Sequence, residues 1–525
     1  TMHALGVRGV RFNLVSPVGN GPEALRALGP RLRALGWHVQ WYAGPQHLAQ
    51  IAALQAECAL PCVLDHLAGM HAQLPAHDAA WQDLARLAGA GAWIKLSGWY
   101  RLQATAPYGT LHAAIERVAG LFGPRMVWGS DWPHTSFAAD AMPAYASVWT
   151  PVASALGAER AQQVLLSQWA ADLIKSWNSH NWIDLPLQVG NKIGRLIGAA
   201  DGQVICCDST SINLFKVLAS AMLMQPGRSV VLSQAGNFPT DLYMVEGLAS
   251  LLGTQRCQLQ LVDDDALERA ITTDVAVLML TQVDFRSGRL LDMQRLTQLA
   301  HTKGVLVIWD LAHSAGALPI ALDNCEVDFA VGCGYKYLNG GPGAPAFLYA
   351  ARRHHANIRQ PLSGWMGHNS PFSFDNHYEK AGGIKQFLTG TPPVISMSVL
   401  DAALDIFDNV DLQQLRDKSL ALSRCFHQLV QQHECLQTLM LITPLIDQQR
   451  GSQLAYQHPN AYELCQALIA QGVIADFRAP NILRLGFTPL YLRYIDMWTA
   501  VEILADIVRN AEYKKAQYSV RHKVT

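Results

Sequence analysis

The sequence has few charged residues and almost no net charge, which limits the partners it can be expected to bind. Charged residues make up 15% of the 525 residues, and the formal net charge is −1 at pH 7. So little excess charge gives no reason to expect nucleic acid or an anionic membrane as a partner. Because half of the residues are apolar, we expect a globular chain, and its length indicates roughly two to four domains.

Long apolar runs and closely spaced cysteine pairs are also missing. No stretch of about 18 uncharged apolar residues occurs, so we expect no transmembrane helix. The first residues, Thr1–Arg8, lack a basic region followed by an apolar one, so secretion is not indicated. The ten cysteines form no C-x-x-C pair, and the adjacent Cys206 and Cys207 rarely suit a disulfide or a shared metal. We therefore expect reduced thiols, no metal site and a cytoplasmic protein.

Two regions follow one another, with a change in character near Lys175–Trp177. Both alternate short apolar runs with helical patterns, which is typical of parallel β/α units. In residues 1–176 the expected strands are Val7–Val15, His38–Tyr42, Cys62–Asp65, Trp93–Leu96 and Met126–Trp128. In the second region they are Val204–Cys207, Ser229–Leu232, Gln258–Val262, Val275–Leu280, Val305–Trp309 and Phe329–Gly332. Expected helices there include Ile212–Met224, Leu291–Lys303 and Asp411–Gln431.

The strongest local signal is a pair of apolar strands that lead into chemically useful residues. The first strand leads into Asp310, with His313 three residues later, and the second leads into Lys336. Pyridoxal phosphate needs such a pair, because its aldehyde condenses with a lysine and its ring nitrogen needs a carboxylate to stay protonated. An open α/β sheet places ligands at the carboxyl ends of its strands. Either residue alone has a plainer explanation, but together they favour a pyridoxal-phosphate site.

Two upstream segments fit the same cofactor. Asp208–Ser211 follows a strand and opens a helix. Hydroxyl groups and free backbone amides at such a helix start bind a phosphate well. A plain N-cap gives the same sequence pattern. Asn237–Asp241 follows the next strand and offers the ring of Phe238 for stacking, with polar groups for the 3-hydroxyl side of the cofactor.

Residues 177–525 resemble kynureninase, a fold-type I pyridoxal-phosphate hydrolase. The tyrosine before Lys336 favours a resemblance to kynureninase over one to the related cysteine desulfurases, which usually carry a histidine at that position. The resemblance implies an α/β fold, with a cofactor-binding large domain over residues 177–394 and a small C-terminal α+β domain over residues 395–525. The matching stretches are Trp182–Pro186, Asp208–Leu214, Phe238–Asp241, Trp309–Gly316 and Gly334–Gly343.

The resemblance also implies residue roles. Lys336 would hold the cofactor and move a proton at the substrate, Asp310 would pair with the ring nitrogen, and Tyr335 would surround the phosphate and serve as an acid or base. Arg484 would bind the substrate α-carboxylate, although a strand arginine in a surface ion pair gives the same pattern. The implied cofactor shell consists of Thr210, Ser211, Phe238, Asp241, Thr281, Asp310, His313, Tyr335, Lys336, Trp365 and Thr391.

The implied reaction is hydrolysis of L-kynurenine, or of 3-hydroxykynurenine, to anthranilate or 3-hydroxyanthranilate and L-alanine. It belongs to tryptophan catabolism along the kynurenine pathway toward NAD biosynthesis. Enzymes of this fold form homodimers, so Trp365 and Thr391 would serve the neighbouring subunit. Kynureninases also carry an opening segment that contributes to the substrate side of the site, and residues 1–176 are unrelated to that segment.

Residues 1–176 resemble the later part of the amidohydrolase-2 family, which includes 2-pyrone-4,6-dicarboxylate lactonase. The stretches that carry the resemblance are Pro61–Gly69, Trp93–Gly98 and Met126–His134. The resemblance implies a partial β/α barrel, in which Asp131 would activate water and His66 would bind a metal or a substrate carboxylate. Five strands are expected where a closed barrel has eight. Two alternatives to a kynureninase therefore stay open: a lactonase that uses Asp131 and His66, and an inactive fusion of two truncated folds.

Overall fold

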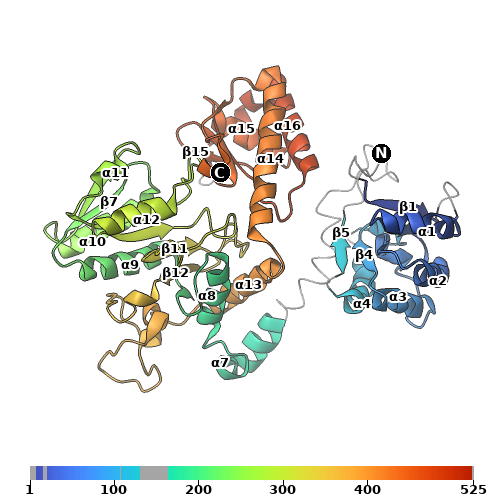
Figure 1. Cartoon of the computed structure of the whole chain (residues 1–525), viewed down its shortest axis with the longest axis horizontal. Coiled ribbons are helices and arrows are strands. Elements are labelled where there is room, and N and C mark those ends of the chain that lie inside the picture. The colour runs from blue at the N-terminus through green and yellow to red at the C-terminus, as the bar shows by residue number, and fades with distance from the viewer. Residues whose placement is uncertain (1–6, 16–20, 107, 124, 130–162, 523–525) are drawn as a thin grey trace. The chain divides into compact units, whose positions relative to one another are not determined.

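The computed structural model describes residues 7–15, 21–106, 108–123, 125–129 and 163–522. The chain forms two compact units, Thr1–Ser167 and Gln168–Thr525 (Figure 1). Each unit is described by itself below. Within the described residues, no helix is long and apolar enough to cross a membrane.

The first unit is built on a five-stranded parallel sheet whose strands lie side by side in chain order. Helices alternate with the strands, as the sequence predicts for part of a β/α barrel. Its strands are β1 (Gly9–Asn13), β2 (His38–Tyr42), β3 (Cys62–Leu64), β4 (Trp93–Leu96) and β5 (Met126–Trp128). Its helices are α1 (Ala24–Ala34), α2 (Leu48–Cys58), α3 (Ala80–Gly89) and α4 (His112–Phe122).

The second unit contains a seven-stranded sheet in the order β6-β12-β11-β10-β9-β7-β8. All of its strands are parallel except β12, which is antiparallel to both of its neighbours. Its strands are β6 (Val204–Cys206), β7 (Val230–Gln234), β8 (Gln258–Val262), β9 (Val275–Thr281), β10 (Leu306–Asp310), β11 (Phe329–Cys333) and β12 (Ala346–Ala350). The central strands are buried along their whole length, as in β9 with its sequence VAVLMLT, because helices cover both faces of the sheet.

The helices of the second unit connect these strands and continue beyond them (Figure 1). Three of them begin at a residue that caps the helix: the side chains of Ser209, Asp292 and Asp411 accept hydrogen bonds from the first turns of α9, α12 and α14. The helices of this part are α7 (Ser176–Ser179), α8 (Leu185–Leu196), α9 (Thr210–Met224), α10 (Pro239–Leu252), α11 (Leu267–Ala270) and α12 (Met293–Thr302). Those that follow the sheet are α13 (Val394–Leu404), α14 (Leu412–Gln432), α15 (Ala461–Ala470) and α16 (Tyr494–Arg509).

A separate four-stranded antiparallel sheet lies in the C-terminal part of the chain, in the order β13-β14-β16-β15. It packs with α14, α15 and α16 around its own apolar core, which includes Phe426, Tyr456 and Leu483. The strands are β13 (Met440–Leu441), β14 (Gln453–Gln457), β15 (Asp476–Arg478) and β16 (Ile482–Gly486). This arrangement brings β15 and β16 toward the large sheet, since Arg484 of β16 bonds to the Phe285 carbonyl.

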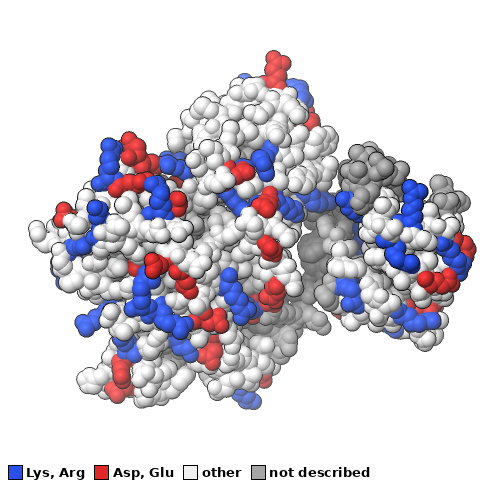
Figure 2. Space-filling view, viewed as in Figure 1, with Lys and Arg blue, Asp and Glu red and all other residues white. Residues whose placement is uncertain are grey.

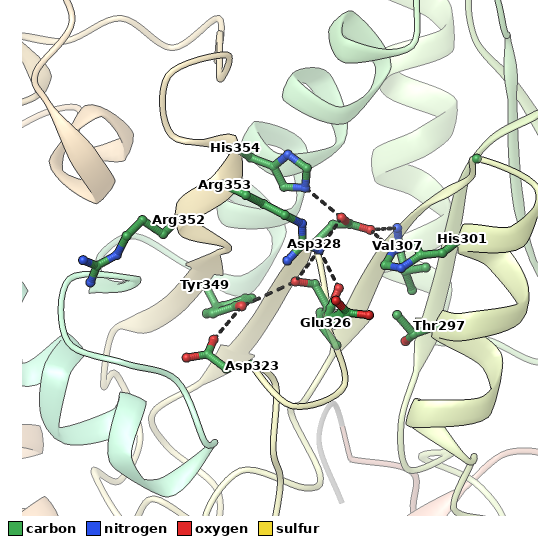
Figure 3. Close-up of polar contacts among 12 residues, drawn as sticks. Thr297, His301, Val307, Asp323, Glu326, Asp328, Tyr349, Arg352, Arg353 and His354 are labelled. Atoms are coloured by element: carbon green, nitrogen blue, oxygen red, sulfur yellow. Dashed lines mark hydrogen bonds and ion pairs between the residues drawn. The ribbon is translucent and has the colours of Figure 1, made fainter.

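The amino ends of β10 and β11 are held by a polar cluster around Asp328 (Figure 3). Asp328 is 2% exposed, and its carboxylate accepts from the Val307 backbone N–H at 2.8 Å and from Arg353 at 2.7 Å. The Nε2 atoms of His301 and His354 lie 2.9 and 2.7 Å from its oxygens. Burial alone would raise the pKa of Asp328, but the hydrogen bonds from the two histidines lower it. This cluster lies at the end of the sheet away from Asp310, and we give it a structural role.

Acidic and basic side chains are interspersed on the visible face of the second unit (Figure 2). Many belong to local pairs, such as Arg295 with Glu268 and Lys192 with Asp401 and Asp405. Surface pairs of this kind contribute little stability.

Candidate active site

Asp310 and Lys336 come from neighbouring parallel strands of the large sheet. Asp310 is the last residue of β10 and Lys336 lies three residues beyond β11, and the two strands pair in parallel. The Asp310 carboxylate is 4% exposed and accepts a hydrogen bond of 2.8 Å from the Ala312 N–H. Burial raises the pKa of Asp310, while the positive charge of Lys336 and the Ala312 hydrogen bond oppose that rise. The structure thus brings the two residues close enough to interact electrostatically.

A second buried carboxyl, Asp241, lies beside the first. It belongs to the first turn of α10 and is 2% exposed. Burial raises its pKa well above the usual range, and the neighbouring charge of Asp310 adds to the rise. The Thr281 hydroxyl lies 2.5 Å from the Asn237 Oδ1 and 3.4 Å from the Asp241 Oδ2. Two carboxyls in one buried site favour binding of a cation such as a protonated ring nitrogen.

His313 is a buried neutral imidazole at the same edge of the sheet. Its pKa is lowered well below the usual range, first by burial and then by the positive charges of Lys336, Arg484 and Arg478. An Arg484 nitrogen, Nη1, lies 3.4 Å from its Nε2. A neutral ring can flank a bound heterocycle without adding charge.

Thr210 and Ser211 open α9 after the left-handed residue Asp208. A cavity of about 550 Å³ lies against this helix start, lined by Asp208, Ser209 and Thr210 on one side and by Tyr335 and Thr391 on others. Free N–H groups at a helix start bind phosphate well. Ser211 is in the same turn but does not line the cavity.

Lys216, which no motif in the sequence pointed to, fixes two walls of this cavity. Its side chain is fully buried, and its Nζ lies 2.6 Å from the Asp208 carboxylate and 2.6 Å from the Phe387 carbonyl. It therefore ties the start of α9 to the segment that carries Thr391. A lone lysine in an apolar helix gave no signal in the sequence.

Phe238 and Tyr335 lie at the exposed side of the site. Phe238 is 39% exposed and meets the Phe285 ring edge-on at a centroid distance of 5.2 Å, so one of its faces is available for stacking. Burial raises the pKa of Tyr335 to about 12, and its neighbour Cys333 adds to the rise. Its phenol is therefore protonated at neutral pH.

Trp365 lies apart from the cavity lining in this chain. It is 40% exposed and packs edge-on against Phe372 at 5.6 Å. Its predicted role in the site of a neighbouring subunit stays a prediction.

Arg484 lies on β16 and is only 8% exposed. Its Nε donates to the Asp476 Oδ1 at 2.8 Å, its Nη2 bonds the other oxygen, and its Nη1 bonds the Phe285 carbonyl. The arginine is thus in an ion pair, but a buried one at the site rather than on the surface. Asp476 and its second partner Arg478 were not predicted, because pairing across β15 and β16 is invisible in the sequence.

In the first unit, His66 lies in a left-handed turn directly after β3. It is 1% exposed, and its Nδ1 lies 2.9 Å from the Ser97 hydroxyl. The adjacent Asp65 accepts hydrogen bonds of 2.8 Å from Arg11 and 2.6 Å from Gln40. Asp131 lies outside the described residues, so its predicted partnership with His66 stays a prediction. In the described part of the chain, no three His, Cys, Asp or Glu side chains gather as metal ligands would.

The residues of the second unit fit pyridoxal phosphate. Two buried carboxyls with raised pKa values suit a protonated ring nitrogen. A lysine lies beside them, and a cavity of about 550 Å³ meets the start of α9, which falls in the ordinary size range for a ligand pocket.

Solved structures define the class of this fold. The apo cysteine desulfurase from Thermococcus onnurineus NA1 is similar with a TM-score of 0.57 and 17% identity, over 67% of this chain and 91% of that one. The cysteine desulfurase CsdA from Escherichia coli gives a TM-score of 0.54 and 20% identity, over 68% and 90%. The second unit therefore has the fold of the fold-type I pyridoxal-phosphate enzymes, as the sequence predicted.

Closer relatives define the family. A kynureninase from Burkholderia pseudomallei is 48% identical over 373 residues, which are 70% of this chain and 89% of that protein. A kynureninase from Pseudomonas fluorescens is 47% identical over 371 residues, with the same two shares. The model of the kynureninase C-terminal domain matches residues 415–504, and that of the amidohydrolase family matches residues 1–165. The chain belongs to the kynureninase family, and both resemblances read from the sequence are confirmed.

Proposed function

We propose that this protein uses pyridoxal phosphate to hydrolyse L-kynurenine, and also 3-hydroxykynurenine, to anthranilate or 3-hydroxyanthranilate and L-alanine. One observation carries the proposal: Asp310 and Lys336 follow the neighbouring parallel strands β10 and β11 at the same edge of the sheet, in a chain 48% identical to a kynureninase. Water and the substrate together supply all atoms of the two products. The carbon–carbon bond broken is the one between the γ-carbonyl and the β-carbon.

Each side chain of the site has a task that follows from its surroundings. The bound cofactor supplies an electron sink for the bonds at the substrate α-carbon. Lys336 holds the cofactor and moves a proton at that carbon, and Asp310, fixed by the Ala312 N–H, keeps the ring nitrogen protonated. Thr210, which lines the cavity, binds the phosphate together with the backbone N–H of Ser211 in the same helix turn. Asp241 and Thr281 complete the shell, and Phe238 stacks on the ring.

Three further residues act on the substrate side. The protonated phenol of Tyr335 donates to an oxygen that gains charge, such as that of the γ-carbonyl during attack by water. The neutral His313 flanks the site without repelling the ring. Arg484 binds the α-carboxylate, with Asp476 holding its guanidinium in place.

The assembly we propose is a homodimer in the cytoplasm. Trp365 is 40% exposed and does not line the cavity of its own chain, which supports a role for it in the site of a second copy. Thr391 lines the cavity of its own chain, and its role in the neighbouring site rests on the family resemblance alone. The ten cysteines are all unpaired, as a reducing compartment requires.

Anthranilate release from L-kynurenine, followed by its fluorescence, tests the proposal with the full chain and added pyridoxal phosphate. The wild type and Lys303→Ala, which removes an exposed lysine after α12, should release anthranilate, and Lys336→Ala should not. Release by Lys336→Ala at the wild-type rate, or no release by a cofactor-loaded wild type, would refute the proposed function.

A further inference from the structure

Asp476 on β15 is shared by two arginines. Arg484 on β16 lies directly opposite Asp476 in the antiparallel register, and its Nε donates to the Asp476 Oδ1 at 2.8 Å. Arg478 lies two residues along the same strand, so its side chain points to the same face as that of Asp476. Its Nη2 donates to the Asp476 Oδ2 at 3.2 Å. One carboxylate therefore faces two guanidinium groups, and the cluster keeps one positive charge in excess.

Burial distinguishes the two arginines. The Arg484 side chain is 8% exposed, whereas that of Arg478 is 34% exposed. Arg484 uses its Nε and Nη2 to bond Asp476, and its Nη1 contacts the Phe285 carbonyl and His313. Arg478 donates to Asp476 and to its neighbouring carbonyl, that of Phe477. A guanidinium has five N–H donors, so Arg478 can bond an incoming anion while keeping both of these contacts.

The excess charge faces the cofactor site. The positive charge of Arg478 helps to lower the pKa of the buried His313. Tyr335 and Arg478 also act on each other electrostatically. Arg484, which shares Asp476 with Arg478, has its Nη1 3.4 Å from the Nε2 of His313. The cluster therefore lies beside the loop that follows β10. An anionic group held there would lie on the same side of the site as His313.

We propose that Arg478 is a substrate-binding residue, which together with Arg484 holds the α-carboxylate of the amino acid substrate, and that Asp476 positions both guanidinium groups. The inference rests on the proposed function, which supplies an amino acid as substrate. Two arginines and one protein carboxylate carry one net positive charge. The α-carboxylate of the substrate carries one negative charge, so its binding neutralises the cluster.

The test measures binding rather than turnover. L-Alanine, the product, carries the α-carboxylate, and ethylamine is the same molecule without it. The dissociation constants of both are measured from the change in visible absorption of the cofactor-loaded full chain. The variants are Arg478→Ala, Arg478→Gln and Arg478→Lys, with Arg509→Ala as the control at an exposed position on α16.

Arg478→Ala and Arg478→Gln should each weaken L-alanine binding about tenfold or more and leave ethylamine binding unchanged. Arg478→Lys should recover part of the loss, because a lysine keeps the charge but not the fork, and Arg509→Ala should bind both ligands like the wild type. A variant that retains the absorption of the bound cofactor is folded. If Arg478→Ala does not bind the cofactor, L-alanine and ethylamine binding are compared in Arg478→Gln instead.

Three results would overturn the inference: unchanged L-alanine binding in the Arg478 variants, an equal loss for L-alanine and ethylamine, or a wild type with no preference for L-alanine. Failure of the proposed function looks different. In that case L-alanine still binds in preference to ethylamine and depends on Arg478, but L-kynurenine yields no anthranilate.

Discussion

At the scale of single residues, the site depends on which groups carry charge before a ligand arrives. Asp241 and Asp310 are buried with raised pKa values, His313 is neutral, and Lys336 lies among them. Two neighbouring buried carboxylates are costly to ionise together. A ligand with a protonated ring nitrogen lowers that cost, because its positive charge stabilises their ionised forms. The roles of Asp310 and Lys336 could be proposed from the sequence, because each follows an apolar strand. The role of Asp241 required the family resemblance, since a helix-start aspartate is common.

Tyr335 gives a prediction about pH. Burial raises its pKa to about 12, so the phenol remains a donor throughout the neutral and mildly alkaline range. Tyr335→Phe should lower kcat about 100-fold, the usual contribution of an acid or base group, with a smaller change in KM. A profile of kcat against pH for the wild type should show no fall in rate due to ionisation of Tyr335 below about pH 11. A fall near pH 9 that disappears in Tyr335→Phe would contradict this assignment.

At the scale of elements, the parallel strands and most helices of the large sheet could be predicted from apolar runs and caps. The strand β12 was not predicted, and it is antiparallel to its neighbours. A short, fully buried strand carries no alternation, so its sequence does not reveal its direction. The register of β15 against β16, which creates the cluster of Asp476 and two arginines, was also beyond prediction, because it depends on which strands pair.

Lys216 links two elements of the phosphate end, and its loss should weaken cofactor binding. Lys216→Met removes the contacts with Asp208 and with the Phe387 carbonyl, which frees the start of α9 from the segment of Thr391. The dissociation constant of pyridoxal phosphate, measured by absorption titration, should rise about tenfold or more. Pyridoxal without its phosphate is the control ligand, and its affinity should change little. An equal loss for both ligands would show that Lys216 does not act at the phosphate end.

Asp328 ties β10, β11 and α12 together at the opposite end of the sheet (Figure 3). Asp328→Asn should destabilise the second unit by about 3 kcal/mol, as expected when a buried ion pair loses one partner. Because its pKa is lowered in the folded state, the stabilisation is fully present above the ordinary carboxyl pKa of about 4 and is lost as pH falls below it. Thermal unfolding of wild type and variant should therefore differ by a constant amount from pH 8 to 5 and converge in more acidic buffer. A difference that grows on acidification would contradict the assignment.

At the scale of the whole molecule, each of the two units has an apolar core of its own. The core of the first unit includes Trp41, Ile94 and Phe122, and those of the second include Val189, Trp309 and Leu464. The change in character near residue 176 indicated this division in the sequence, and the structure divides the chain after Ser167. Units with separate cores are expected to unfold separately.

Calorimetry should therefore show two transitions for the full chain. Pyridoxal phosphate should raise the midpoint of the transition of the second unit only, because a ligand stabilises the part that binds it. Asp65→Asn, which weakens the contacts with Arg11 and Gln40, should lower only the midpoint of the first. It should leave anthranilate release unchanged. Loss of anthranilate release in Asp65→Asn would show that the first unit takes part in the reaction.

Mass spectrometry tests the assignment of Lys336 most directly. The cofactor-loaded full chain is reduced with borohydride, which fixes the cofactor on its lysine, and is then digested and mapped. The expected result is one pyridoxyl group, located on the peptide that contains Gly334–Leu338. A label on another lysine, or an unlabelled Lys336 peptide from a loaded sample, would contradict the assignment.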